Sequence, residues 1–285
     1  MTEAARFREL LRRDGMVVAP GAYDCITARL IERAGYDVVY MTGAGTAATL
    51  GYPDFGLVTM TEMVDNARRI ATAVGVPVIA DADTGYGNEL NVVRTVREYE
   101  AAGVAGIHIE DQGFPKKCGH LDDKEIVKRA DWLAKIRAAA AARRCRDFTV
   151  IARTDARAVA GFDEAIGRAN DAIEAGADMV FVEAPQTLEE VARVPKLVRG
   201  PCLLNVVYGG KTPEIDLAEA ERMGYKLAIV PGLLIKNVVG ICEKTLAELA
   251  ATRRHPKPVR EMTVRETFQL WGADEWDALR TRFRD

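Results

Sequence analysis

One arrangement of apolar and polar positions recurs along the chain. A helical pattern ends at a glycine, and a short apolar run rich in β-branched residues follows two or three positions later. The recurrence is found at ERAGYDVVYM, TAVGVPVIAD, EAAGVAGIHIE, EAGADMVFVE and RMGYKLAIVP, with Gly35, Gly75, Gly103, Gly176 and Gly224 as the glycines. Glycine just past a helix end adopts the left-handed conformation without strain, and the apolar runs have the length of buried strands. The pattern therefore predicts alternating helices and strands.

Three further apolar runs, at 16–19, 148–152 and 202–204, raise the number of predicted strands to eight. The runs are continuous rather than alternating, which is typical of a parallel sheet covered on both faces. Thr59 with Glu62 and Thr187 with Glu190 have the spacing of helix capping boxes, and Thr212 before a proline predicts another helix start. Eight strand-helix units in about 250 residues indicate an α/β fold of the (β/α)8 TIM barrel type. A doubly wound open sheet is the alternative, disfavoured because no G-x-G-x-x-G follows a strand.

The end of the chain has a different pattern. A predicted helix over about 233–253 is followed by the break HPKP and then by VRETFQLWGADEWDALRTRF, which is apolar enough to need a partner surface. We therefore divide the chain into a catalytic barrel, 1–254, and a C-terminal helical extension, 255–285. The extension is expected to pack outside its own barrel or on another subunit.

Composition excludes several classes of function. The apolar content of 48% is ample for a core, and the net charge of −3 without a basic block argues against nucleic acid as a partner. No apolar run is long enough to span a membrane, and the charged first residues do not resemble a signal peptide. The five cysteines are odd in number and widely spaced, which favours reduced thiols and a cytoplasmic location.

Polar residues follow six of the predicted strands directly. In a barrel the carboxyl ends of the strands surround one pocket, so these side chains are the candidate site. They are Thr42, Asp81, Asp83, Glu110, Asp111, Arg153, Asp155, Glu183 and Asn205.

Several of these side chains are carboxylates. Asp81 and Asp83 are two positions apart and point the same way in an extended strand end, with Glu110 closing the next strand. Converging negative charges repel unless they are neutralised, and an all-oxygen ligand set favours a hard divalent ion, Mg²⁺ or Mn²⁺. The alternatives are a protonated carboxylate pair or salt bridges to Lys116, Lys117 or Arg153.

A second group lies in the loop EDQGFPKKCGHLDDKE, which places Lys116, Lys117, Cys118 and His120 within five residues. Cationic neighbours stabilise a thiolate, so we expect a lowered pKa and a reactive thiol at Cys118. A zinc site is disfavoured because no second Cys/His pair accompanies Cys118 and His120. An ordinary solvated loop is the other alternative.

A glycine-rich stretch, MTGAGTAATLGYPDFG, follows the second strand. Its backbone amides at Gly43, Ala44 and Gly45 suit a carboxylate or small oxyanion, since the Gly-Lys-Ser/Thr of a phosphate loop is missing. His108 alternates with Glu110 and should face the barrel interior. There we expect a hydrogen-bonded core histidine rather than a catalytic one.

Together these stretches resemble the isocitrate lyase and phosphoenolpyruvate mutase superfamily. The matching pieces stand in family order: MTGAGT at 41–46, PDFG at 53–56, DADTGYGN at 81–88, HIEDQ at 108–112, KKCGH at 116–120, IARTDA at 151–156, FVEA at 181–184 and GGKTP at 209–213. The branches that look most similar are methylisocitrate lyase, 2,3-dimethylmalate lyase, oxaloacetate hydrolase and carboxyphosphonoenolpyruvate mutase.

The resemblance implies roles for individual residues. Asp81 and Asp83 would bind Mg²⁺, and Asp54 and Glu110 would reach the ion through water. Cys118 would be the proton donor and acceptor. The remaining implied catalytic residues are Lys116, Lys117, His120, Arg153 and Glu183. The implied substrate-binding residues are Thr42, Gly43, Ala44, Asp81, Cys118, Gly119, Arg153, Glu183 and Asn205.

The implied activity is Mg²⁺-dependent cleavage of a carbon–carbon bond. The substrate would be a 2-hydroxy di- or tricarboxylic acid, of the substituted malate or methylisocitrate type, and the products a 2-oxo acid such as pyruvate and a carboxylic acid. A carboxyphosphonoenolpyruvate-type phosphonomutase, an oxaloacetate hydrolase and a non-catalytic 2-oxo acid binding protein are the alternatives. The implied assembly is a homotetramer in which paired subunits exchange C-terminal helices.

Three positions depart from the methylisocitrate lyase pattern. That branch carries Thr-Glu where this chain has Val207 and Tyr208, and an arginine where it has Lys236. Loss of a hydroxyl and a carboxylate and gain of an aromatic ring favour a less polar distal group. A smaller or more hydrophobic malate derivative is therefore expected rather than a tricarboxylate.

Overall fold

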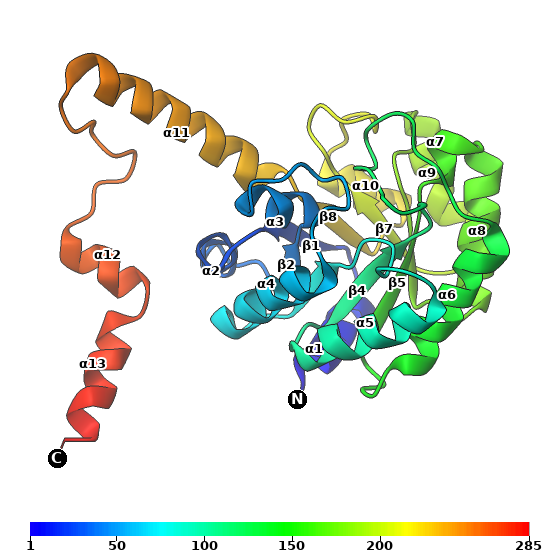
Figure 1. The fold of residues 1–285 in the computed structure, drawn as a ribbon, viewed down its shortest axis with the longest axis horizontal. Coiled ribbons are helices and arrows are strands. Elements are labelled where there is room, and N and C mark those ends of the chain that lie inside the picture. Colours follow the sequence, from blue (N-terminus) through cyan, green and yellow to red (C-terminus); the bar gives the residue numbers. More distant parts are fainter. Residues whose placement is uncertain (285) are drawn as a thin grey trace. The chain divides into compact units, whose positions relative to one another are not determined.

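The computed structural model describes residues 1–284 of the chain. Within them the chain divides into two compact units, 1–236 and 237–284. The first unit is a closed barrel of eight parallel strands in which each strand pairs with its neighbour in sequence and β1 pairs with β8 (Figure 1). The strands are β1 Val17–Ala22, β2 Val39–Met41, β3 Val78–Asp81, β4 Gly106–Glu110, β5 Thr149–Thr154, β6 Met179–Val182, β7 Cys202–Asn205 and β8 Leu227–Val230. The predicted (β/α)8 barrel is confirmed.

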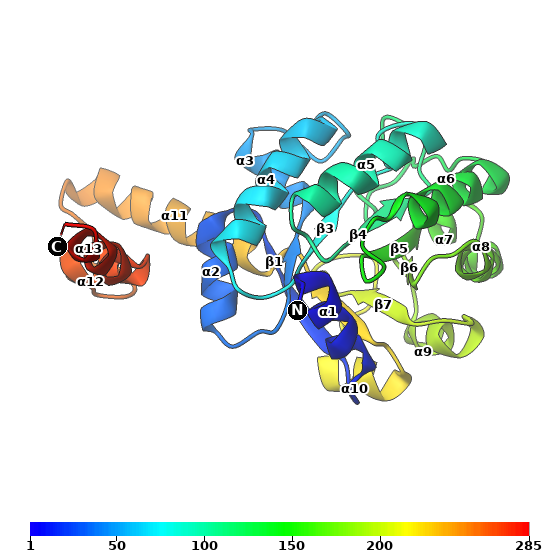
Figure 2. The same ribbon diagram turned by 90° about the horizontal axis from the view of Figure 1, so that it is seen from below.

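Helices surround the strands, as Figure 2 shows from a second direction. They are α1 Glu3–Arg12, α2 Cys25–Arg33, α3 Gly43–Thr49, α4 Met60–Ala73, α5 Glu89–Ala101, α6 Arg129–Ala142, α7 Ala156–Val159, α8 Phe162–Glu174, α9 Leu188–Leu197 and α10 Leu217–Met223. α11, Leu233–Thr252, begins in the first unit and continues into the second.

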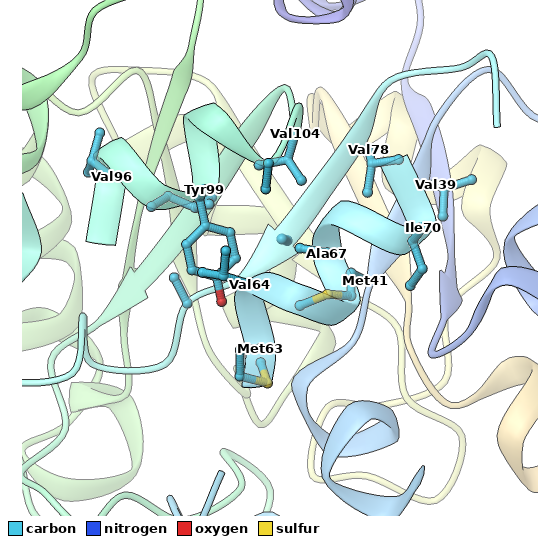
Figure 3. Packing of buried hydrophobic residues seen from close by; sticks show 14 of the residues in the cluster. Val39, Met41, Met63, Val64, Ala67, Ile70, Val78, Val96, Tyr99 and Val104 are labelled. Carbon is cyan, nitrogen blue, oxygen red and sulfur yellow. The ribbon is translucent and has the colours of Figure 1, made fainter. Parts of the chain in front are cut away.

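The apolar core has an outer and an inner layer. In the outer layer, Met63, Ala67 and Ile70 of α4 face Met41 of β2 and Val78 of β3 (Figure 3). The inner layer fills the barrel and includes Tyr40, Ile79, Ile151, Phe181, Leu203, Leu227 and Ile229. Phe7 and Leu10 of α1 join this inner layer, so the first helix packs against the barrel interior.

Most local signals in the sequence are confirmed, and two are wrong. Gly35, Gly103, Gly176 and Gly224 have positive φ, but Gly75 does not, because the chain leaves α4 through an extended Val74. Thr59 and Glu62 form a full capping box. No helix begins at Thr212: α10 starts at Leu217, where the Asp216 side chain accepts the free backbone N–H groups of Ala218 and Glu219.

The second unit contains the rest of α11 together with α12 Val264–Leu270 and α13 Ala273–Arg282. None of these three helices has a buried residue. The division between the two compact units falls at Lys236, inside α11. No helix among residues 1–284 is long and apolar enough to cross a membrane.

Candidate active site

A cavity of about 330 Å³ lies at the carboxyl ends of the barrel strands. It brings together residues that are far apart in the sequence and that end different strands. Its lining is Tyr40, Thr42, Ala44, Gly45, Asp54, Asp81, Cys118, Gly119, His120, Arg153, Glu183, Asn205, Val207, Gly209, Gly210, Pro231, Gly232, Ile235 and Lys236. Ten of the residues expected in the site line it directly: Thr42, Ala44, Asp54, Asp81, Cys118, Gly119, His120, Arg153, Glu183 and Asn205.

On one side of the cavity a single ammonium group lies among the carboxylates. The buried Lys116 Nζ lies 2.7 Å from Asp83 Oδ1 and also pairs with Asp54. Asp81 accepts the Asp83 backbone N–H through Oδ1 at 2.9 Å. Burial raises the pKa of Asp83 to about 6 despite Lys116, whereas the pKa of Asp81 lies below its ordinary value, so Asp83 is the weaker acid of these two. The salt bridges that the sequence analysis kept as an alternative are therefore present.

Glu110 is buried in a different setting. Neither of its carboxylate oxygens has a hydrogen-bond partner among the described residues, and Arg153 Nη1 lies 3.3 Å from Oε2. Burial raises the pKa of Glu110 well above its ordinary value. An unsatisfied buried carboxylate is costly, so this position calls for a proton, a water or a cation.

The acidic residues have the donor atoms of a metal site. Within residues 1–284, no group of three or more His, Cys, Asp or Glu side chains stands in an arrangement that could hold a metal ion. The donor chemistry nevertheless fits a hard divalent cation, because Asp54, Asp81, Asp83 and Glu110 offer only oxygen atoms and all four carboxylates raise the pKa of Lys116. The ammonium of Lys116 holds the place between Asp54 and Asp83 where a cation would be stabilised.

Arg153, near the end of β5, lines the same cavity and is held by several neighbours. Its Nε donates to Asp155 Oδ2 at 3.0 Å, and its Nη2 lies 3.6 Å from Glu183 Oε2. Its guanidinium also stands over the Phe181 ring, 5.0 Å from the centroid. These contacts and the ion pair with Glu110 fix the guanidinium in the barrel mouth. The guanidinium is therefore oriented to stabilise a negative charge that develops in the cavity.

Glu183 is held by a second set of donors. His120 Nε2 lies 3.0 Å from Glu183 Oε1, and Asn205 Nδ2 lies 3.3 Å from Oε2. His120 Nδ1 accepts the backbone N–H of Lys211 at 3.0 Å. Burial alone would raise the pKa of Glu183, but Arg153 and His120 outweigh it, and the pKa lies below its ordinary value. Glu183 is therefore an ionised carboxylate at neutral pH.

Cys118 lines the cavity, but the expected lowering of its pKa is wrong. Burial raises the pKa of the thiol, and nearby Asp54 and Glu183 raise it further. The two lysines that were expected to lower the pKa of Cys118 interact with other groups. Lys116 pairs with Asp54 and Asp83, and Lys117 Nζ donates to the Asp123 carbonyl at 3.3 Å. At neutral pH Cys118 is a thiol, which is the form that can donate a proton.

The glycine-rich stretch lies beside the acidic residues. Thr42 is the N-cap of α3, and its hydroxyl accepts the Gly45 N–H. A Cβ on Gly43 would stand 2.3 Å from Asp81 Oδ2, so only glycine allows this close approach. Gly43 therefore supports Asp81, while Thr42 and Ala44 face the cavity.

His108 behaves as expected of a core histidine. Its Nε2 is 2.9 Å from the Tyr40 hydroxyl and its Nδ1 is 3.6 Å from Asp81 Oδ1. Burial lowers the pKa of His108 to about 4, so the ring is neutral at physiological pH.

The distal end of the cavity is partly apolar. Val207, Pro231 and Ile235 line it beside Lys236. The Tyr208 ring does not contribute as the sequence analysis assumed: its residue is 77% exposed, and Lys236 Nζ donates to its carbonyl. Sequence reasoning missed Pro231 and Ile235, although Pro231 directly follows β8 and Ile235 lies in the first turn of α11.

The phosphoenolpyruvate phosphomutase family model matches residues 7–250. The chain belongs to this family. It is 54% identical over 232 residues to 2,3-dimethylmalate lyase of Eubacterium barkeri, which covers 81% of this chain and 80% of the relative. It is 45% identical over 242 residues to 2-methylisocitrate lyase of Aeropyrum pernix, covering 85% and 78% of the two chains.

Solved structures of the same superfamily have the same fold. A crystal structure of 2,3-dimethylmalate lyase superposes with a TM-score of 0.94 at 40% identity and covers 99% of this chain and 95% of its own. Phosphonopyruvate hydrolase in complex with oxalate and Mg²⁺ has a TM-score of 0.90 at 31% identity, with 100% of both chains covered. The chain is thus an enzyme of the isocitrate lyase/phosphoenolpyruvate mutase superfamily, whose named relatives are lyases and mutases.

Proposed function

We propose that the protein is a Mg²⁺-dependent carbon–carbon lyase that cleaves a substituted malate into a 2-oxo acid and a carboxylic acid. The observation that carries the proposal is the protonated Cys118 thiol in the same cavity as the fixed Arg153 guanidinium and the acidic residues. The similarity to 2,3-dimethylmalate lyase supports the same reaction class.

The acidic residues would supply the metal site. Asp81 and Asp83 would hold Mg²⁺, or Mn²⁺, with Asp54 and Glu110 reaching it through water, and the Lys116 amine would have to leave its position between Asp54 and Asp83. The Mg²⁺ of the related phosphonopyruvate hydrolase supports this assignment. When bound, the ion would polarise the 2-hydroxyl and carboxylate oxygens of the substrate.

The chain's own residues account for the remaining chemistry. Thr42 and the amides around Ala44 would hold the carboxylate of the 2-oxo acid portion. The bond between carbons 2 and 3 breaks, its electron pair passes to carbon 3, and carbon 2 becomes the carbonyl. Arg153 stabilises the negative charge on the departing carboxylic acid portion, and the Cys118 thiol gives its proton to carbon 3. The 2-hydroxyl proton passes to solvent, and Cys118 takes a proton back from solvent after product release, so that no net proton is gained or lost.

The distal lining supports a less polar substrate than methylisocitrate. Val207, Pro231 and Ile235 offer no hydrogen-bonding side chain to a third carboxylate, and Lys236 is occupied with the Tyr208 carbonyl. A methyl-substituted malate buries its branches against this wall more favourably than a charged carboxylate does. Equal or better turnover of methylisocitrate than of 2,3-dimethylmalate would contradict this substrate assignment.

The decisive experiment is a substrate panel. The purified protein with Mg²⁺ is incubated with substituted malates, methylisocitrate, isocitrate, oxaloacetate and carboxyphosphonoenolpyruvate, and released 2-oxo acid, oxalate and phosphonate are measured. Cleavage of a malate derivative is expected, with loss on chelation and recovery with Mg²⁺ or Mn²⁺. Oxalate from oxaloacetate would instead make it a hydrolase, and a phosphonate product a mutase. Binding of 2-oxo acids without turnover would make it a binding protein.

A matched pair of variants tests the proton donor. Cys118→Ser is expected to lose about 10²- to 10⁴-fold in kcat, because a hydroxyl is a much weaker proton donor than a thiol. Cys242→Ser, which changes an exposed cysteine of α11, is the control and should retain activity. Full activity of Cys118→Ser would remove Cys118 from this role.

We also propose a cytoplasmic homotetramer in which C-terminal helices are exchanged between paired subunits. The free state of all five cysteines and the exposed apolar residues Leu246, Phe268 and Trp276 of the second unit support this assembly and location. Light scattering on the eluted protein measures the mass directly, and a monomer at micromolar concentration would contradict the assembly.

A further inference from the structure

Lys124 lies at the base of the loop that carries Cys118. The loop begins at Gln112 and ends at Ile126, which form an antiparallel bridge. The Gly113 N–H donates to the Glu125 carbonyl at 2.9 Å, and the Val127 N–H donates to the Asp111 carbonyl at 2.9 Å. These backbone hydrogen bonds close the base of the loop, so the side chain of Lys124 starts from a fixed position.

The Lys124 side chain is only 1% exposed and makes two contacts. Its Nζ donates to the carbonyl oxygen of Gly119, the residue after Cys118. It also donates to Asp155 Oδ1 at 2.7 Å. A buried ammonium is stable only when it is paired, and both of its partners belong to the immediate surroundings of the cavity.

Asp155 connects Lys124 to Arg153. Its carboxylate accepts Arg153 Nε at 3.0 Å, and its backbone N–H donates to Asp111 Oδ1 at 2.7 Å. Burial alone would raise the pKa of Asp155, but Arg153 and Lys124 outweigh it and lower the pKa to about 2. Without Lys124, the full charge of Asp155 would act on Arg153. Arg153 also forms ion pairs with Glu110 and Glu183.

The loop has little freedom on its other side. A Cβ on Gly119 would stand 2.4 Å from Arg153 Nη2 and 2.6 Å from Glu183 Cγ. The backbone at Gly119 thus packs closely against Arg153 and Glu183, which line the cavity, and the hydrogen bond from Lys124 holds it there. A displacement of about 1 Å at reacting groups can cost about 100-fold in rate.

We propose that Lys124 is a positioning residue that sets the location of the Cys118 thiol through the Gly119 carbonyl and the aim of Arg153 through Asp155. Lys124 does not line the cavity and touches no substrate atom in this role. The expected effect of a Lys124 substitution on kcat rests on the lyase function proposed above. Its expected effect on the accessibility of Cys118 does not.

The kinetic test compares Lys124→Met with Lys128→Met, which removes an exposed lysine just beyond the same loop. Lys124→Met is expected to lower kcat by about 10- to 100-fold, as is typical when a group that orients a reacting residue is removed. KM should change much less than kcat, because the carboxylate-binding residues around Thr42 are untouched. Lys128→Met should retain both constants, and Lys124→Arg should recover part of the lost kcat.

The second test measures alkylation of Cys118 by iodoacetamide, followed by mass spectrometry of the peptide. It needs no substrate, so it remains informative if the protein acts on another compound. Release of the loop in Lys124→Met should speed alkylation of Cys118 about tenfold, while Cys242 reacts at an unchanged rate and serves as the internal control. A purely structural contribution of Lys124 would lower the melting temperature and leave both rates unchanged in the folded protein.

Lys124→Gln covers the case in which Lys124→Met does not fold. The amide keeps a donor for Gly119 but removes the charge beside Asp155, and we expect a smaller loss of kcat and smaller gain in alkylation. A folded Lys124→Met or Lys124→Gln with kcat within about twofold of the unaltered protein and unchanged Cys118 alkylation overturns the proposal. Failure of both variants to fold at 25 °C also overturns it, since Lys124 would then act on barrel stability.

Discussion

The two tryptophans Trp132 and Trp276 show how differently the two units of this chain are stabilised. Trp132, in α6 of the barrel, is 0% exposed and packs in a cluster of buried apolar residues. Trp276, in α13 of the second unit, is 72% exposed. The barrel contains its own core and the whole candidate site, while the helices of the second unit bury no residue. The first unit therefore has both a core of its own and the candidate site, whereas the exposed helices of the second unit are the part that we propose for association.

The largest expected effect is on barrel stability. Trp132→Ala should lower the free energy of unfolding by about 3–5 kcal/mol, because it leaves a cavity in a closely packed cluster. Its Nε1 has no hydrogen-bond partner among the described residues, so Trp132→Phe should cost clearly less. Denaturant unfolding followed by circular dichroism measures both. Equal losses for the two variants would contradict a packing role.

The next effect is on specificity and tests whether the distal end of the barrel cavity selects the substrate. Val207→Thr places a hydroxyl in the apolar lining and should reduce the preference for 2,3-dimethylmalate over methylisocitrate by about 10-fold in kcat/KM. Tyr208→Phe is the control, since that ring is exposed outside the cavity. A larger effect of the Tyr208 substitution would reverse our assignment of the specificity-determining position.

A smaller effect concerns pH. Because burial raises the pKa of Cys118, the donor stays protonated through neutral pH, and kcat/KM should decline on the alkaline side only above the ordinary cysteine range of about 8.5. The rate of Cys118 alkylation should rise over that same alkaline range. Cys242→Ser should leave the profile unchanged. If the decline of kcat/KM and the rise of the alkylation rate were both centred near neutral pH, the Cys118 thiol would ionise there, as its charged neighbours alone suggest.

The smallest effect on the barrel is expected from the second unit. Trp276→Ala should change the free energy of barrel unfolding by less than about 0.5 kcal/mol in dilute solution, as for other exposed positions. Its effect should appear instead in assembly, as a lower mass by light scattering at equal concentration. If Trp276→Ala lowered the free energy of unfolding as much as Trp132→Ala and left the mass unchanged, the two units would not differ in the way proposed here.

The fold was predictable because each strand carries its own signal. The apolar runs before Thr42, Asp81 and Glu183 are short, continuous and bounded by glycine, so no long-range information is needed to recognise them. The role of α1 was not predictable, because a charged amphipathic helix gives no indication of which surface it covers. The packing of Phe7 into the barrel interior depends on the closed sheet, which exists only after folding.

The sequence predicted which residues lie in the site but not which of them form ion pairs and hydrogen bonds with one another. Strand-end positions correctly gathered Asp81, Arg153 and Glu183 around one cavity. Sequence spacing could not tell which carboxylate each cation would meet, and so the pKa of Cys118 was expected to move in the wrong direction. Lys124 escaped notice because its two partners, Gly119 and Asp155, become neighbours only when the loop folds back onto β5.

The hydrogen bond from Lys211 to His120 restricts what this histidine can do. A backbone N–H can only donate, so Nδ1 must present a lone pair, and the single ring proton resides on Nε2 facing Glu183. In this tautomer the imidazole is committed at both nitrogens and has no free site with which to relay a proton. The hydrogen bond from Nε2 keeps Glu183 ionised and fixed in place, and in the reaction that we propose the proton donor is therefore the Cys118 thiol rather than His120.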